Sequence, residues 1–111
     1  MTGVQTCALP ILLPRLKTPL AHLLLAAATG KLAEHPPLEW SSDSAVTVVL
    51  ASEGYPQQPV TGREITAITE RADTYIFHAG TTSDSGRLLS SGGRVLAVTG
   101  IGPNLERARA H

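Results

Sequence analysis

Cysteine, aromatic residues and clustered charge are all scarce in this sequence. Its 111 residues include one Cys, one Trp, two Tyr and one Phe, and nine Lys plus Arg balance nine Asp plus Glu. A single cysteine excludes an intrachain disulfide framework and a site built from several thiolates. A nucleic-acid surface needs a clustered positive face, often with stacking aromatics, so we expect no nucleic-acid partner. Cytoplasm is the default location for such a composition.

Long apolar runs are missing as well. The run Leu23–Ala28 is far shorter than the roughly 20 apolar residues that a membrane-spanning helix needs. The first segment, Met1–Ile11, has neither Lys nor Arg, whereas a secretory signal begins with a basic region. We therefore expect no membrane partner and no export signal.

The uncharged N-terminal segment has a different explanation. VQTCALPI (Val4–Ile11) is the literal translation of GTT CAG ACG TGT GCT CTT CCG ATC, which resembles the end of a common short-read sequencing adapter. We interpret residues 1–11 as translated adapter with no fold of its own. The only cysteine, Cys7, lies in this segment, so the natural sequence offers no thiol chemistry.

Residues 12–44 are predicted to form a linking helix and a connector. Good helix formers fill Pro19–Thr29, with Thr18 as the expected N-cap and Gly30 in the left-handed position that ends a helix. Five apolar residues of this helix fall on one stripe: Leu20, Leu23, Leu24, Ala27 and Ala28.

The connector is predicted over Lys31–Asp43, where prolines and serines interrupt regular structure. Leu38 and Trp40 are its expected apolar anchors.

Residues 45–111 are predicted to form a small β-rich domain that is truncated in its last helix. Asn104 is a good N-cap for that helix, which begins LERARA. AGTTSDSG, residues 79–86, is expected to be a polar turn, and Glu64–Arg71 fits either a short helix or an irregular strand. The fold class is α+β, with a small antiparallel sheet or open barrel. The expected strands are Ala45–Ser52, Thr74–His78, Arg87–Ser90 and Arg94–Thr99.

Several catalytic patterns are absent from the sequence. Gly100-Ile101-Gly102 lacks the third glycine of a dinucleotide fingerprint, and we interpret it as a strand-to-helix turn. No phosphate-binding P-loop and no GxSxG elbow occurs, and the histidines show no paired metal spacing. No lysine follows Lys31, which excludes a biotinyl or lipoyl arm. We predict no catalytic residue and no metal ligand in this chain.

Two glycine-containing turns are the best candidates for a binding site. One is His78-Ala79-Gly80-Thr81, and the other is Gly92-Gly93-Arg94. Glycine lets the backbone and its amides approach a partner closely, and an arginine beside it offers a planar donor fork for carboxylate or phosphate. On physical grounds alone, β-turns with a solvent-facing arginine explain the same residues.

Taken in order, LPRLKTPLAHLLLAAATGKL, L-x-W, AVTVVLASEGYP, IFHAGTT, GGRVLAVTGIG and LERARA resemble the C-terminal part of the glycinamide ribonucleotide synthetases, the phosphoribosylamine-glycine ligases of the ATP-grasp superfamily. The resemblance runs from about Leu13 to Ala110. Ser91 stands where the family usually has Asn, and Gly92, Gly93 and Arg94 stay in register.

This resemblance implies an enzyme of purine biosynthesis. The family joins phosphoribosylamine to glycine with ATP, which first converts the glycine carboxylate to an acyl phosphate, and Mg²⁺ assists. ATP and Mg²⁺ would bind upstream of LPRLK, on a core against which this domain packs. The chain alone is therefore expected to be inactive. Substrate-binding residues implied here are His78, Gly80, Thr81, Gly92, Gly93 and Arg94.

Two alternatives stay open at this stage. The chain fits a non-catalytic small binding or structural β-domain, or the corresponding domain of another ATP-grasp enzyme such as a carboxylase. FHAGT and GGRVL together favour the ligase family over the carboxylase alternative.

Overall fold

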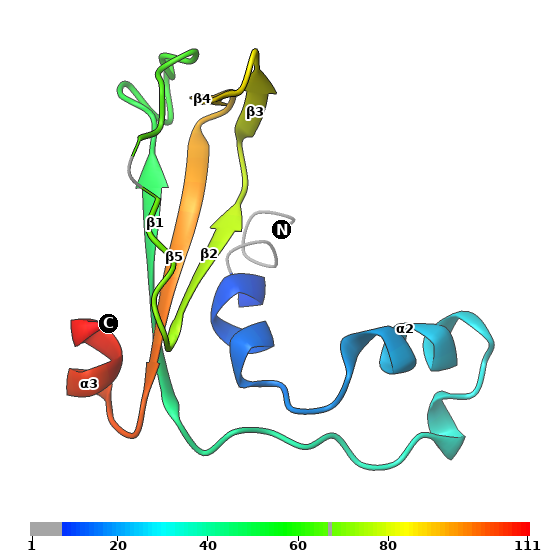
Figure 1. The fold of residues 1–111 in the computed structure, drawn as a ribbon. Coiled ribbons are helices and arrows are strands. Elements are labelled where there is room, and N and C mark those ends of the chain that lie inside the picture. Colours follow the sequence, from blue (N-terminus) through cyan, green and yellow to red (C-terminus); the bar gives the residue numbers. More distant parts are fainter. Residues whose placement is uncertain (1–7, 67) are drawn as a thin grey trace.

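The fold combines a three-stranded sheet, a two-stranded hairpin and short helices (Figure 1). The computed structural model describes residues 8–66 and 68–111. Residues 8–12 are helical. The further elements are η1 (Leu13–Arg15), α2 (Leu20–Ala28), η2 (Leu32–Glu34), β1 (Ser44–Ala51), β2 (Thr74–His78), β3 (Thr81–Asp84), β4 (Arg87–Ser90), β5 (Arg94–Gly102) and α3 (Leu105–Ala110).

The longest strand, β5, is the centre of the larger sheet. It pairs antiparallel with β1 on one side and with β2 on the other. Val98 illustrates the register, because it lies opposite Val48 of β1 and Ile76 of β2. Apolar and β-branched residues on all three strands favour this pleated arrangement. The buried apolar core lies mainly on β5, with Val95, Leu96, Ala97 and Ile101, and is completed by Ala108 of α3.

The predicted strands are confirmed, with shifts at their ends, but the prediction of a polar turn over residues 79–86 was wrong. Thr81–Asp84 form β3, which pairs antiparallel with β4, and Ser85 and Gly86, with φ of 50° and 80°, form the turn between these two strands. β-branched threonines and a strand partner within a few residues stabilise a hairpin here, which composition alone did not indicate.

Gly100-Ile101-Gly102 was predicted as a turn and instead continues β5, opposite Ser44–Val46 of β1. The glycines are needed because α3 packs directly on them. A Cβ at Gly102 would lie 2.7 Å from the amide nitrogen of Ala108, and one at Gly100 would overlap the Ala108 carbonyl oxygen. The predicted cap is confirmed, since the Asn104 side chain accepts a hydrogen bond from the Arg107 amide at 2.9 Å.

The predicted linking helix is present, and it stands apart from the sheet (Figure 1). Gly30 has φ of 70°, as expected at a helix end. The prediction that Thr18 caps the helix was wrong: its hydroxyl oxygen accepts a hydrogen bond from the Glu39 amide at 2.8 Å. Thr18 thus fastens the connector to the start of the helix.

The apolar stripe of α2 is largely exposed, and the prediction that Leu38 and Trp40 anchor the connector was wrong. Leu24 is 59% exposed on α2, and Leu38 and Trp40 are 41% and 46% exposed on the connector. The described residues supply no second layer that would cover these side chains. The surface that would cover this apolar stripe is therefore not provided by the described residues.

Glu64–Arg71 forms no helix among its described residues; Glu64 makes an isolated bridge to Leu89 of β4. The α+β class predicted from the sequence is confirmed. Within residues 8–66 and 68–111, no helix is long and apolar enough to cross a membrane.

Candidate functional site

The two glycine turns predicted as a site lie at the same end of the sheet. His78 is the last residue of β2 and pairs with Leu96 of β5. Leu96 lies two residues after Arg94, the first residue of β5. The amides of Ala79 and Gly80 both donate to the carbonyl oxygen of Val95, at 3.0 and 3.1 Å. Antiparallel pairing of β2 with β5 therefore brings the two turns together.

Gly80 and Gly92 are in close backbone contact. A Cβ at Gly80 would lie 2.5 Å from the carbonyl oxygen of Arg94 and 2.9 Å from Cα of Gly92. The Ser91 amide also donates to the Gly80 carbonyl at 2.8 Å. Gly80 was expected to be a backbone donor to a ligand, but its amide is already engaged with Val95. Its role is to let the turns touch.

The Gly92-Gly93 turn has its carbonyls engaged. The Ser52 hydroxyl donates to the Gly92 carbonyl at 2.7 Å, and the Ser52 amide donates to the Gly93 carbonyl at 2.8 Å. The amides of both glycines have no acceptor among the residues that the structure describes. They are the backbone donors that remain in this cluster.

Tyr55 belongs to the same cluster and was not predicted. A Cβ at Gly93 would clash with ring carbon Cδ2 of Tyr55 and lie 2.7 Å from Cε2, so the ring rests on the glycine. The sequence did contain the signal, since Tyr55 lies in the Gly54-Tyr55-Pro56 part of a loop rich in prolines and glycines. Nothing in the sequence showed that this loop meets Gly93.

His78 and Arg94 line one cavity of about 410 Å³. This volume falls in the range of small-molecule sites, about 300–1,000 Å³. His78 Nδ1 is hydrogen-bonded to the Thr81 hydroxyl, with 2.9 Å between the two atoms, which orients the ring. The other lining residues are apolar: Leu9, Pro10, Leu13, Val49, Phe77, Ala79, Leu96 and Ala97.

The structure thus divides the six predicted site residues. His78 and Arg94 line the cavity, whereas Gly80, Thr81, Gly92 and Gly93 form the turns beside it. A mostly apolar lining that includes one arginine and one histidine suits a small molecule that carries one anionic group.

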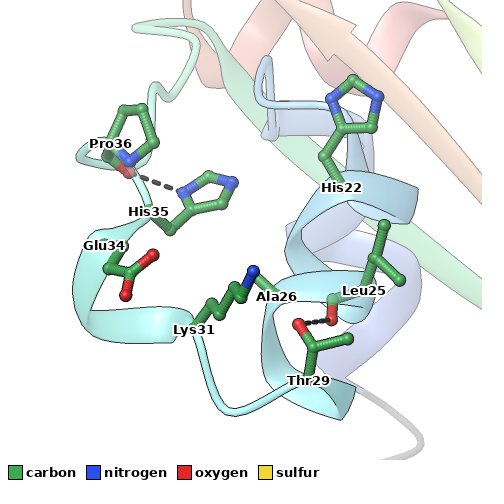
Figure 2. Close-up of a pocket in the computed structure, with 8 residues that line it drawn as sticks. All are labelled: His22, Leu25, Ala26, Thr29, Lys31, Glu34, His35 and Pro36. Atoms are coloured by element: carbon green, nitrogen blue, oxygen red, sulfur yellow. Dashed lines mark hydrogen bonds between the residues drawn. The ribbon is translucent and has the colours of Figure 1, made fainter.

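A second hollow, of about 450 Å³, lies between α2 and η2. Figure 2 shows His22 and Leu25 on the α2 side and Lys31 and His35 on the other side. His35 Nδ1 lies 2.7 Å from the Pro36 carbonyl oxygen. No group of three or more His, Cys, Asp or Glu that could hold a metal ion occurs among residues 8–66 and 68–111. We therefore assign no metal to this hollow.

A family model described as phosphoribosylglycinamide synthetase, C domain, matches residues 45–111. The chain belongs to the phosphoribosylglycinamide synthetase family. All six predicted site residues lie within the matched C domain. This match favours the ligase family over both an unrelated small β-domain and the corresponding domain of a carboxylase.

The relatives that this chain matches are much longer than the chain itself. It is 52% identical over 104 residues to phosphoribosylamine–glycine ligase of Streptomyces coelicolor, covering 89% of this chain and 25% of the relative. The Corynebacterium ammoniagenes ligase is 53% identical over 100 residues, covering 89% and 23%. The crystal structure of the Thermotoga maritima ligase aligns with a TM-score of 0.61 at 37% identity, covering 78% and 22%. The chain thus spans about a quarter of the length of the relatives it matches.

Proposed function

We propose that this chain is the C-terminal part of the enzyme that joins 5-phosphoribosylamine and glycine, with ATP, to give glycinamide ribonucleotide, ADP and phosphate. The observation that carries the proposal is the C-domain match over residues 45–111. It is supported by relatives of 50% identity or more that are named for this ligase. The proposal includes the cytoplasmic location expected from the sequence.

The nucleotide and metal parts of this reaction belong elsewhere in the enzyme. Mg²⁺ prefers carboxylate and phosphate oxygens, and the described residues contain no cluster of acidic or histidine side chains that fits it. ATP and Mg²⁺ bind to the rest of the full-length ligase, and the 111-residue chain alone has no ligase activity.

Within the intact ligase, the cavity beside the glycine turns holds an anionic part of a substrate. Arg94 supplies the charged fork for a phosphate or carboxylate, and the amides of Gly92 and Gly93 supply backbone donors. His78, oriented by Thr81, forms the polar edge. Gly80 contributes by permitting the contact between the two turns.

The chain packs on the ATP-grasp core through its uncovered apolar residues, of which Leu24, Val48 and Trp40 are examples.

Leu9 and Pro10 line the cavity, and both fall in the segment predicted to be translated adapter. We propose that another part of the full-length ligase forms this wall. Sequencing the source DNA through the Ile11–Leu12 junction with adapter-free reads tests the adapter interpretation; reads that contain the Val4–Ile11 codons would overturn it.

A hybrid ligase tests the function. Residues 12–111 replace the corresponding C-terminal part of the Streptomyces coelicolor relative, and formation of ADP is measured with both substrates and with each omitted. We expect turnover that requires glycine and phosphoribosylamine, and none from the 111-residue chain. A folded hybrid without turnover, beside an active parental enzyme, would contradict the proposal, and so would turnover by the chain alone.

A further inference from the structure

The loop that follows β1 is held together by its own backbone. Within residues 52–60, which we call the tyrosine loop, the Tyr55 amide donates to the Ser52 carbonyl at 3.1 Å and the Gln58 amide to the Gly54 carbonyl at 2.9 Å. The Val60 amide closes the loop on the Glu53 carbonyl at 2.8 Å. These bonds fix the residues of the loop relative to one another.

The tyrosine loop docks on the Gly92-Gly93 turn at two places. Ser52 donates to the carbonyls of both glycines, at 2.7 and 2.8 Å. The Tyr55 ring lies so close to Gly93 that no side chain fits there. Because the carbonyls are held and the ring covers Cα, the turn has little freedom to rotate, and Arg94 follows it directly in the chain.

Tyr55 is poorly placed to contribute to a core. It is 44% exposed, so its ring leaves much apolar surface in water and gains only part of the free energy of full burial. The specific contact of the ring is with the backbone of the turn that precedes Arg94. This geometry suits a residue that orients a neighbour.

We propose that Tyr55 is a positioning residue of the ligase, which acts through Gly93 to aim Arg94 into the cavity shared with His78. The inference rests on the proposed function of Arg94. Catalysis is sensitive to the position of a substrate-binding group, and a displacement of such a group by about 1 Å can lower the rate on the order of 100-fold. The tyrosine loop thereby belongs to the substrate site although Tyr55 does not line the cavity.

A double-mutant cycle in the hybrid ligase tests this inference. Arg94→Ala identifies the substrate whose KM depends on Arg94. Tyr55→Ala is expected to raise that same KM by about tenfold, with a smaller change in kcat, and to add nothing when Arg94 is already alanine. Tyr55→Phe keeps the ring and is expected to restore most of the affinity. Tyr75→Ala is the matched control, because Tyr75 is 46% exposed near the opposite end of β2.

The outcomes separate this inference from the proposed function. If Arg94→Ala changes no KM, the role of Arg94 fails and the inference falls with it. If Arg94→Ala raises a KM but Tyr55→Ala has no effect, or an effect that simply adds, only the inference is overturned. Should Tyr55→Ala unfold the hybrid, Ser52→Ala replaces it in the cycle, since it removes the bond to the Gly92 carbonyl with a small change in volume.

Discussion

The hydroxyl oxygens of Thr47 and Thr99 lie 2.7 Å apart across β1 and β5, and Thr99 is completely buried. The Thr99 hydroxyl also donates to the carbonyl oxygen of Pro10 at 2.7 Å. Because a hydroxyl has one proton and a carbonyl has none, Thr99 gives its proton to Pro10 and Thr47 donates to Thr99. One buried side chain of β5 thus joins both β1 and the helical segment that contains Pro10 to the central strand.

Thr99→Val should destabilise the 111-residue chain by about 1–3 kcal/mol, since it leaves the Thr47 hydroxyl and the Pro10 carbonyl without their partner. Thr47→Val removes only a donor from a half-buried position and should cost less, about 0.5–1.5 kcal/mol. Denaturant titration gives both free energies of unfolding. Equal costs for the two variants would show that the bond to Pro10 does not contribute.

Gly80→Ala should destabilise the chain by about 1–3 kcal/mol, because the new Cβ meets backbone atoms of Arg94 and Gly92 that cannot move independently. Gly92→Ala is the matched control for stability. Its Cβ would lie 3.4 Å from Gly80 Cα, an ordinary contact, and the expected change is within about 0.5 kcal/mol. Chemical denaturation of the two variants compares them, and a Gly92→Ala cost as large as that of Gly80→Ala would refute the close-approach argument.

Arg94→Ala in the hybrid ligase should raise the KM of one anionic substrate by about 10-fold or more, since a charge-assisted hydrogen bond contributes roughly 1.5–3 kcal/mol. Arg87→Ala serves as control. Arg87 is 56% exposed on the hairpin and pairs with Asp84 at 3.6 Å, so its loss should change neither KM nor kcat. Initial rates with each substrate varied in turn measure both variants. Similar effects of the two substitutions would argue against a specific role for Arg94.

The exposed apolar surface of α2 should make the 111-residue chain self-associate. Leu24 and Leu25 are 59% and 62% exposed on a helix that the sheet does not cover (Figure 1). Contiguous exposed apolar patches of this kind mark interaction surfaces. Light scattering coupled to gel filtration should show concentration-dependent oligomers, which Leu24→Lys with Leu25→Lys reduces. A strictly monomeric wild-type chain would contradict the assignment of α2 to an interface.

Local sequence patterns determined most elements of this protein. The β-branched run of β1, the Asn104 cap and the left-handed Gly30 each act within a few residues, so their structural consequences follow from neighbouring residues alone. The sequence motifs FHAGT and GGRVL likewise indicated the family that the C-domain match established.

Only the tertiary structure decided which distant residues meet. Gly100–Gly102 continue β5 because β1 supplies their hydrogen-bonding partners, and α3 packs against them because Gly100 and Gly102 have no side chain. Neither condition can be predicted from the neighbouring residues alone. The Tyr55–Gly93 contact joins loops almost forty positions apart, and no periodicity encodes such a distance. Sequence alone therefore determined most of the elements and the family, whereas packing between segments decided the remaining elements and the geometry of the site.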